Sequence, residues 1–402
     1  MRIGYSYWGF LGDHKLGADG KALSTPDGNA AYSWAIIHEL IRRDYTVYAM
    51  QEDRDRPGFT RYGKELFASF SQEKRLVAYE GMEQTNGVDL PELDLLLVEW
   101  RFPIFGRNCH SWEGAPCFPS RWYKTGYDGK GSLEGEVLQP DLFRQYQLLK
   151  HYKERGTKII FWDLDHKVLK HDEEYWKPDA VFETSKRPLH LHAKRTSVEF
   201  PIVVADLMQH PTLPGDPLRK LVYIGSRYER DDVITEWLKP ISDAYPQQVE
   251  FWGNWTNSLD ECKKLWPNVS FNGRITMSDF HRVYGSAIAC PILAKKSYLE
   301  TGFITPRPWE ALMFGTIPVG LGSHLGVSDY VLPGFVAGDG RDMIGVVETL
   351  TGLSVQNRDH LRRENVEWIE PMDVRYFVDK MEDVVDEVVD TGEDLRIKNQ
   401  GA

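Results

Sequence analysis

A glutamate lies where a polar loop meets a short predicted helix, in the segment TPRPWEALMFGTIPVG at residues 305–320. The helix is expected to open near Trp309 and Glu310, to stop at Gly315, and to lead into a buried strand at residues 317–319. A carboxylate in the first turn of a helix is stabilised by the helix dipole. It can also accept hydrogen bonds from ribose hydroxyls. Glu310 is therefore a candidate nucleotide ligand, with dipole stabilisation alone as the alternative.

Cations follow two predicted strands in the same half of the chain: arginines follow one strand, and Lys295 and Lys296 follow a strand that ends at Leu293. The strand at residues 221–224 runs into a glycine turn that carries two arginines, in the sequence GSRYER at residues 225–230. A diphosphate requires exposed N–H groups and one or two fixed cations, although such arginines can also be simply solvated. After the strand at residues 249–252, Gly253 either permits close backbone approach or makes a tight turn. The candidate donor-binding residues are Gly225, Ser226, Arg227, Arg230, Gly253, Lys295, Lys296 and Arg307.

Two carboxylates and a histidine end a strand in the first half of the chain. Asp163, Asp165 and His166 follow the apolar run IIFW at residues 159–162. The carboxyl ends of parallel strands face the ligand crevice, where a general base for an acceptor hydroxyl would be needed. A hydrogen-bonded loop without a catalytic role is the alternative.

The helix predicted from Asn29 onward can be capped by Asp27 or Asn29. Its free N–H groups, with Gly28 beside them, would face a diphosphate across the crevice. Capping alone also explains these residues.

A long connection at residues 101–131 combines cations with aromatic rings. It holds five Lys/Arg against two acidic residues, with seven aromatic residues among them. Residues 186–195 form a second basic stretch without any acidic residue. Such surfaces suit a phosphate backbone with an unstacked base, but they also suit sugars or serve as structural loops. The candidate acceptor-binding residues are Arg101, Arg107, Trp112, Arg121, Trp122, Tyr123, Lys124, Lys186 and Arg187.

These residues are spread over two runs of alternating strand and helix signals, which predict two α/β domains with parallel sheets. A turn-rich stretch at residues 210–217 separates the runs. We expect a first domain at 1–212, a second domain at 213–365, and an acidic helix and tail at 366–402. The net charge of −12 does not exclude a phosphate-bearing acceptor, because residues 366–402 hold 11 acidic and 4 basic residues.

The four cysteines form no CxxC pair, which is typical of free thiols in a reducing cytoplasm. No run of about 18 apolar residues predicts a membrane span. No GxGxxG motif follows a predicted strand, which disfavours dehydrogenase chemistry.

The segment around Glu310 resembles the Glu-x-x-x-x-Gly-Thr-x-Pro-Val segment of glycosyltransferases with the GT-B fold. Three short segments also resemble, in the same order, those of the DNA α-glucosyltransferase family of T-even phages: Asp165–Leu169, Trp252–Asn254 and Gly315–Val319. The resemblance implies two facing Rossmann-like domains, the first on the acceptor side and the second binding the nucleotide sugar, with the C-terminal helix packed back on the first. It also implies that Glu310 binds ribose and that Asp165 is the base. Gly315 and Thr316 would let the next strand approach the nucleotide, which makes Thr316 a candidate donor-binding residue. A second family glutamate would correspond to Glu300, which lies ten residues upstream of Glu310.

The resulting hypothesis is a monomeric glycosyltransferase with a nucleotide-diphosphate sugar, expected to be a UDP-sugar, as co-substrate. The resemblance further implies retention of configuration, no essential metal and no other cofactor. The expected acceptor is a hydroxymethylated pyrimidine in phage DNA, which would place the protein in the cytoplasm of a host cell. A saccharide or cell-envelope acceptor, or a non-catalytic binding module on the same scaffold, is the alternative.

Overall fold

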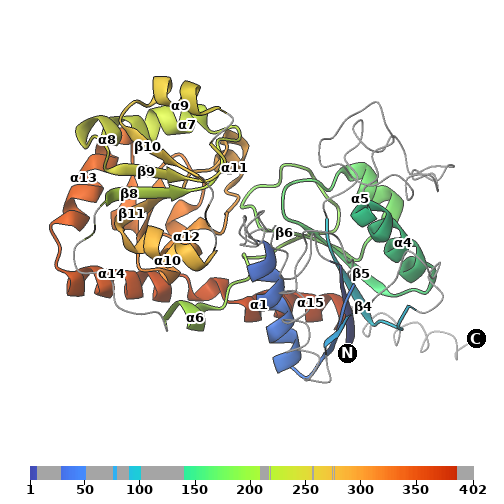
Figure 1. Ribbon diagram of the computed structural model, residues 1–402. Coiled ribbons are helices and arrows are strands. Elements are labelled where there is room, and N and C mark those ends of the chain that lie inside the picture. Colours follow the sequence, from blue (N-terminus) through green and yellow to red (C-terminus); the bar gives the residue numbers. More distant parts are fainter. Residues whose placement is uncertain are drawn as a thin grey trace, which may run out of the picture.

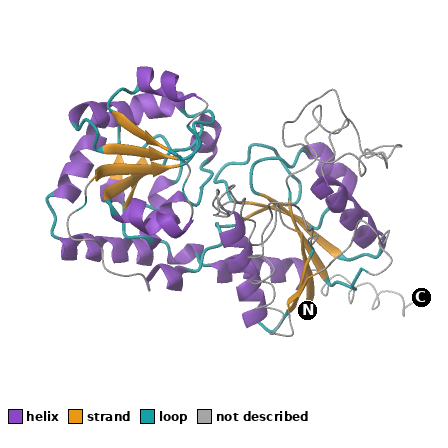
Figure 2. Ribbon diagram, in the orientation of Figure 1, coloured by secondary structure: helices purple, strands orange, loops and turns teal. Residues whose placement is uncertain are grey.

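The computed structural model describes residues 1–6, 29–50, 76–78, 90–100, 140–208, 217, 219–255, 258–273, 275 and 277–386. Within these ranges the chain forms two separate parallel sheets flanked by helices (Figures 1 and 2). We call each sheet with its helices a domain. The predicted connection at residues 101–131 and most of the predicted linker lie outside the described residues, and the domain boundaries stay predictions.

The first sheet has the strand order β3-β2-β1-β4-β5-β6-β7, and each neighbouring pair is parallel. The central strand β4 has the sequence LLLVE and is buried throughout, as expected where helices cover both faces of a sheet. The strands are β1 (Arg2–Ser6), β2 (Thr46–Ala49), β3 (Leu76–Ala78), β4 (Leu95–Glu99), β5 (Lys158–Asp163), β6 (Ala180–Glu183) and β7 (Arg195–Ser197).

The second sheet repeats this plan with the order β10-β9-β8-β11-β12-β13, again all parallel. In both sheets the strand order reverses beside the first strand, which places a ligand crevice at the carboxyl edge. The strands are β8 (Arg219–Ile224), β9 (Val249–Trp252), β10 (Val269–Asn272), β11 (Ala287–Pro291), β12 (Ile317–Leu321) and β13 (Val336–Ala337).

The helices that cover these sheets include a continuous helical segment at residues 231–244, in which one π-helical turn, η2, separates α7 from α8. Among the described residues, no helix is both long and apolar enough to cross a membrane. Cys262 and Cys290 are buried free thiols. In chain order the helices are α1 (Asn29–Arg42), α4 (Pro140–Glu154), α5 (Lys170–Trp176), α6 (Val204–Met208), α7 (Asp231–Val233), η2 (Ile234–Leu238), α8 (Lys239–Ala244), α9 (Leu259–Leu265), α10 (Met277–Gly285), α11 (Lys296–Thr301), α12 (Arg307–Met313), η4 (Val327–Asp329), η5 (Pro333–Phe335), α13 (Gly340–Thr351), α14 (Val355–Trp368), η6 (Glu370–Met372) and α15 (Val374–Asp386).

The last described helix, α15, returns to the first domain and lies beside α1 (Figure 1). Arg43 Nη1 lies 2.7 Å from Asp379 and 2.8 Å from Glu382, while the Phe377 ring packs 4.9 Å from Trp162 on β5. The prediction that the C-terminal helix packs back on the first domain is confirmed.

Within the described residues, the chain passes between the domains in two places that lie side by side. The first passage lies between β7 and α6, and the second links α14 to α15. Ile202 and Asp373 form a parallel bridge between the two passages, and Val374 N–H donates to Ile202 O at 2.7 Å. Asp373 also accepts a bond from Val204 N–H at 3.2 Å. The two connections are therefore hydrogen-bonded to each other.

Candidate functional site

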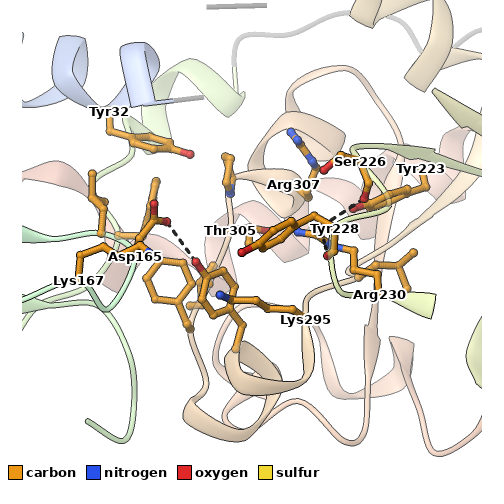
Figure 3. Close-up of a pocket in the computed structure, with 17 residues that line it drawn as sticks. Tyr32, Asp165, Lys167, Tyr223, Ser226, Tyr228, Arg230, Lys295, Thr305 and Arg307 are labelled. Carbon is orange, nitrogen blue, oxygen red and sulfur yellow. Dashed lines mark hydrogen bonds between the residues drawn. The ribbon is translucent and has the colours of Figure 1, made fainter. Parts of the chain in front are cut away.

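A cavity of about 420 Å³ lies between the domains, where the loops after β5, β8 and β11 meet (Figure 3). Residues from both domains line it, so neither domain forms it alone. The lining residues are Tyr32, Leu164, Asp165, Lys167, Phe200, Tyr223, Ser226, Tyr228, Arg230, Leu293, Lys295, Tyr298, Phe303, Ile304, Thr305, Pro306 and Arg307.

The glycine turn after β8 brings Ser226 and Arg230 to the cavity. Arg230 Nη1 donates to the carbonyl oxygens of Ser226 at 3.2 Å and Tyr228 at 2.9 Å, which holds the guanidinium over its own loop. Gly225 N–H donates to Trp252 O at 2.8 Å. Gly253 has φ 140°, and a Cβ there would lie 1.9 Å from Gly225 O. Gly253 thus lets the turns after β8 and β9 touch.

Arg227 is not among the lining residues, although the sequence predicted it as a phosphate ligand. Its Nη1 lies 2.5 Å from Glu261, and its Nε donates to Asp231 at 2.8 Å. Hydrogen bonds to these two carboxylates raise its pKa. The structure therefore gives Arg227 carboxylate partners outside the cavity.

Lys295 and Lys296, at the start of α11, have different surroundings. Lys295 lines the cavity, with its ammonium 4.4 Å from the Tyr298 ring centroid and 5.7 Å from that of Tyr228. Burial lowers its pKa. Lys296 is 83% exposed and lies 3.9 Å from Glu300 one turn along the helix. Only Lys295 is placed to meet a ligand in the cavity, and Glu300 is likewise outside the lining.

Arg307 reaches the cavity from the first turn of α12 and is paired with Glu310. Burial opposes the charge of Arg307, but the Glu310 carboxylate beside it raises its pKa. Glu310 also accepts a hydrogen bond from Tyr284 at 3.1 Å. Thr316 is buried, and its hydroxyl donates to Tyr284 O. Glu310 and Thr316 thus lie behind the cavity wall, where Glu310 holds Arg307, and their nucleotide contacts stay predictions.

The loop after β5 places Asp165 in the cavity lining, whereas the side chains of Asp163 and His166 are buried. Asp163 accepts N–H bonds from Lys167 at 2.6 Å and Val168 at 3.0 Å, and burial raises its pKa to about 8. These bonds shape the turn. Asp165 lines the cavity and accepts a hydrogen bond from Tyr298 at 3.1 Å.

His166, the second predicted catalytic residue, is packed beneath this loop rather than in the cavity lining. Its ring lies edge-on to Phe303 at 5.1 Å and Tyr298 at 5.7 Å, and its Nε2 lies 3.6 Å from Glu183 Oε1. Burial lowers its pKa to about 4, so the ring is neutral near pH 7. The structure supports a packing role for His166.

Lys186 joins the two domains, whereas the sequence predicted that it binds an acceptor. Its ammonium lies 2.9 Å from Glu199 in the first domain and 3.0 Å from Asp329 in the second. Arg187 is exposed, and its backbone N–H donates to Thr301 O at 2.9 Å across the domain interface.

Several predicted residues lie outside the described part of the chain or have no described side chain. Asn29 is the first residue of α1, but its side chain is not described. The residues outside the described ranges are Gly28, Arg101, Arg107, Trp112, Arg121, Trp122, Tyr123 and Lys124. Their roles stay predictions.

Lys167 and a group of aromatic residues were not predicted as site residues, although they line the cavity. Lys167 and Tyr228 belong to the same short sequence segments as the predicted site residues Asp165 and Arg230, and Tyr298 follows Lys295 by three residues. Tyr32 and Phe200 carry no local signal, because only the fold brings α1 and the chain after β7 to the same cavity.

The described lining residues contain four cations, Lys167, Arg230, Lys295 and Arg307, and one carboxylate, Asp165. This excess of positive charge favours binding of an anion such as a diphosphate, and Asp165 provides one candidate base beside it. In the part of the chain that the structure describes, no three His, Cys, Asp or Glu side chains cluster as metal ligands.

No protein-family model and no curated protein sequence matches this chain. Solved structures match nearly all of it. The β-glucosyltransferase of phage T4 covers 96% of this chain and 100% of its own, at 14% identity and a TM-score of 0.53. AviGT4, a glycosyltransferase involved in avilamycin A biosynthesis, covers 96% and 98%, at 14% identity and a TM-score of 0.53. A glycosyltransferase from Rickettsia africae covers 96% and 98%, at 9% identity and a TM-score of 0.52. These similarities confirm the predicted GT-B fold.

Proposed function

We propose that this protein is a glycosyltransferase that takes a sugar from a nucleotide-diphosphate donor, a UDP-sugar, and transfers it with retention to an acceptor hydroxyl. The observation that carries the proposal is the interdomain cavity, whose described lining holds four cations and one carboxylate. The matched phage T4 enzyme has been crystallised with its UDP-glucose substrate, at a TM-score of 0.51, which supports the choice of donor.

The cations would act on the leaving diphosphate. Negative charge develops on the diphosphate as the sugar bond breaks, and fixed cations in a partly closed cavity stabilise that charge more than solvent does. Arg230 and Arg307 are already held in place by the Ser226 carbonyl and by Glu310, so little reorganisation is needed. Lys295 lies between Arg230 and the candidate base in Figure 3.

Asp165 would accept the proton of the acceptor hydroxyl. It is the one carboxylate among the described lining residues, and it faces the cationic wall across the cavity (Figure 3). A general base must lie within hydrogen-bond reach of the proton that it removes. The cavity is the place where an acceptor could meet both Asp165 and a bound donor.

For the acceptor we propose a hydroxymethylated pyrimidine in DNA. The support comes from the motif segments and from the cationic and aromatic composition of residues 101–131. A saccharide or cell-envelope acceptor is the second candidate, and the match to an enzyme of avilamycin A biosynthesis favours keeping it.

The test incubates the protein with several nucleotide sugars and with DNA that contains hydroxymethylcytosine, hydroxymethyluracil or unmodified bases. Nucleoside mass spectrometry should detect one added hexose or pentose on a hydroxymethylated base, and NMR of the product reports the anomeric configuration. Asp165→Asn and Glu310→Ala should reduce turnover. Donor cleavage without base modification would point to the second candidate. If both variants retained wild-type turnover, the assignment of this site would be wrong.

A further inference from the structure

The candidate base is held by a residue of the opposite domain. Tyr298, on α11 of the second domain, donates a hydrogen bond from its hydroxyl to Asp165 Oδ1 at 3.1 Å (Figure 3). Asp165 belongs to the loop after β5 of the first domain. Both residues line the cavity. The position of the carboxylate is therefore linked to the contact between the two domains.

The Tyr298 ring is itself fixed on three sides. It packs 4.4 Å from the Phe303 ring and 5.7 Å from the His166 ring, and the Lys295 ammonium lies 4.4 Å above its centroid. The residue is 9% exposed. Because the ring cannot turn without disturbing these neighbours, its hydroxyl has a defined direction. A hydroxyl so placed can orient the group that it binds.

A carboxylate has two acceptor oxygens, and a hydrogen bond on one of them fixes the direction of the other. An aspartate that lost this bond would be held less firmly in one orientation. This change slows proton transfer, because a general base must stay within reach of the proton that it removes, and it removes no group that binds the donor.

We propose that Tyr298 is a positioning residue for Asp165, which it orients only when the two domains are in contact. The proposal rests on the proposed function, in which Asp165 is the base. Lys295 links the two halves of the reaction, because it packs on the Tyr298 ring and also lines the cavity where the diphosphate is proposed to bind. Donor binding and the orientation of the base thus both depend on the packing of Lys295 against Tyr298.

Tyr298→Phe tests the proposal, because it keeps the ring packing and removes only the hydroxyl. Steady-state kinetics should show kcat reduced on the order of tenfold, the effect of losing one hydrogen bond to a charged group. The KM for the donor should change less than about twofold, because no donor-binding group is removed. Tyr376→Phe removes a hydroxyl from an exposed tyrosine on α15 and should leave these parameters unchanged.

A second measurement tests the contact without activity. Tyr298→Phe, Asp165→Ala and the double variant are unfolded in denaturant, and the midpoint shifts of the single variants should not add if the side chains interact. Additive shifts would overturn the inference, whatever the activity of the protein. Coupled shifts with an unchanged kcat would overturn the positioning role and leave the glycosyltransferase function standing. A wild-type protein without turnover of any nucleotide sugar would overturn the proposed function and the positioning role together.

Discussion

The ammonium of Lys186 lies 3.0 Å from Asp329 Oδ2, and this pair joins the two domains. The side chain runs past Gly302 and Gly326, where an added Cβ would lie 2.9 Å from Lys186 Cγ. Burial opposes its charge, but Glu199 and Asp329 together raise its pKa. The two glycines provide the space through which the lysine reaches the second domain.

Lys186→Met should therefore reduce stability more than it reduces acceptor binding. We expect a loss of about 1–2 kcal/mol in the free energy of unfolding, since one partly buried charged group with two partners is removed. Denaturant unfolding measures this loss, and Lys194→Met, at an exposed lysine, is the control. An unchanged unfolding midpoint combined with weaker, salt-dependent DNA binding would instead favour the acceptor role predicted from the sequence.

Lys295 and Lys296 form a matched pair for testing the donor site. Lys295→Met should weaken UDP binding by about tenfold or more, because it removes a partly buried cation, whereas Lys296→Met should leave it unchanged. Because burial lowers the pKa of Lys295, its ammonium loses its proton at lower pH than that of an exposed lysine. UDP affinity should therefore begin to fall at a lower pH than for an exposed site. Isothermal titration calorimetry measures both effects, and equal losses from the two variants would contradict this placement.

His166 should make the protein sensitive to mild acid. Its pKa is about 4 in the folded chain and 6.5 as the ordinary value, so the unfolded chain binds the proton more readily between these values. The buried neutral ring contributes its full stabilisation above about pH 6.5. This contribution is lost as the pH falls towards 4, which lowers the free energy of unfolding by at most about 3 kcal/mol. His166→Gln should flatten this part of the stability profile, whereas His360→Gln, at an exposed residue, should not. An unchanged slope in His166→Gln would show that the ring is not buried as described.

Gly253→Ala should be strongly destabilising, because a Cβ would overlap the Gly225 carbonyl and because φ 140° is unfavourable for alanine. We expect a loss of about 2–4 kcal/mol. Gly273→Ala is the control, since a Cβ there meets no atom within 4 Å. Thermal unfolding compares the two variants, and similar melting temperatures would exclude the close approach of the two turns.

The fold was predictable because its central strands are continuous apolar runs, such as LLLVE in β4 and the run ending at Trp162 in β5. The strands predicted at residues 221–224, 249–252 and 317–319 differ from β8, β9 and β12 by at most two residues at either end. The short strands β7 and β13 were not predicted, since three exposed or half-buried residues and a two-residue strand give no periodic signal. Helix α14 was also missed, because buried arginines such as Arg362 take the place of apolar residues on its inner face.

The site was only partly predictable because a sequence shows which residue types are near one another but not which direction they face. Arg227 and Arg230 belong to one motif, yet only Arg230 lines the cavity. Lys295 and Lys296 are adjacent, yet only Lys295 lines the cavity. The Asp165–Tyr298 bond joins residues 133 positions apart, and nothing in either local segment indicates it.

The hydrogen-bonded pair of passages at Ile202 and Asp373 limits how the domains can move. A single connection would allow both twisting and bending about one point. Two connections that lie side by side behave as a hinge with one axis, so opening would separate the cavity walls while keeping them in register. Each closure would then return Tyr298 to the same partner, Asp165, without a search through other orientations.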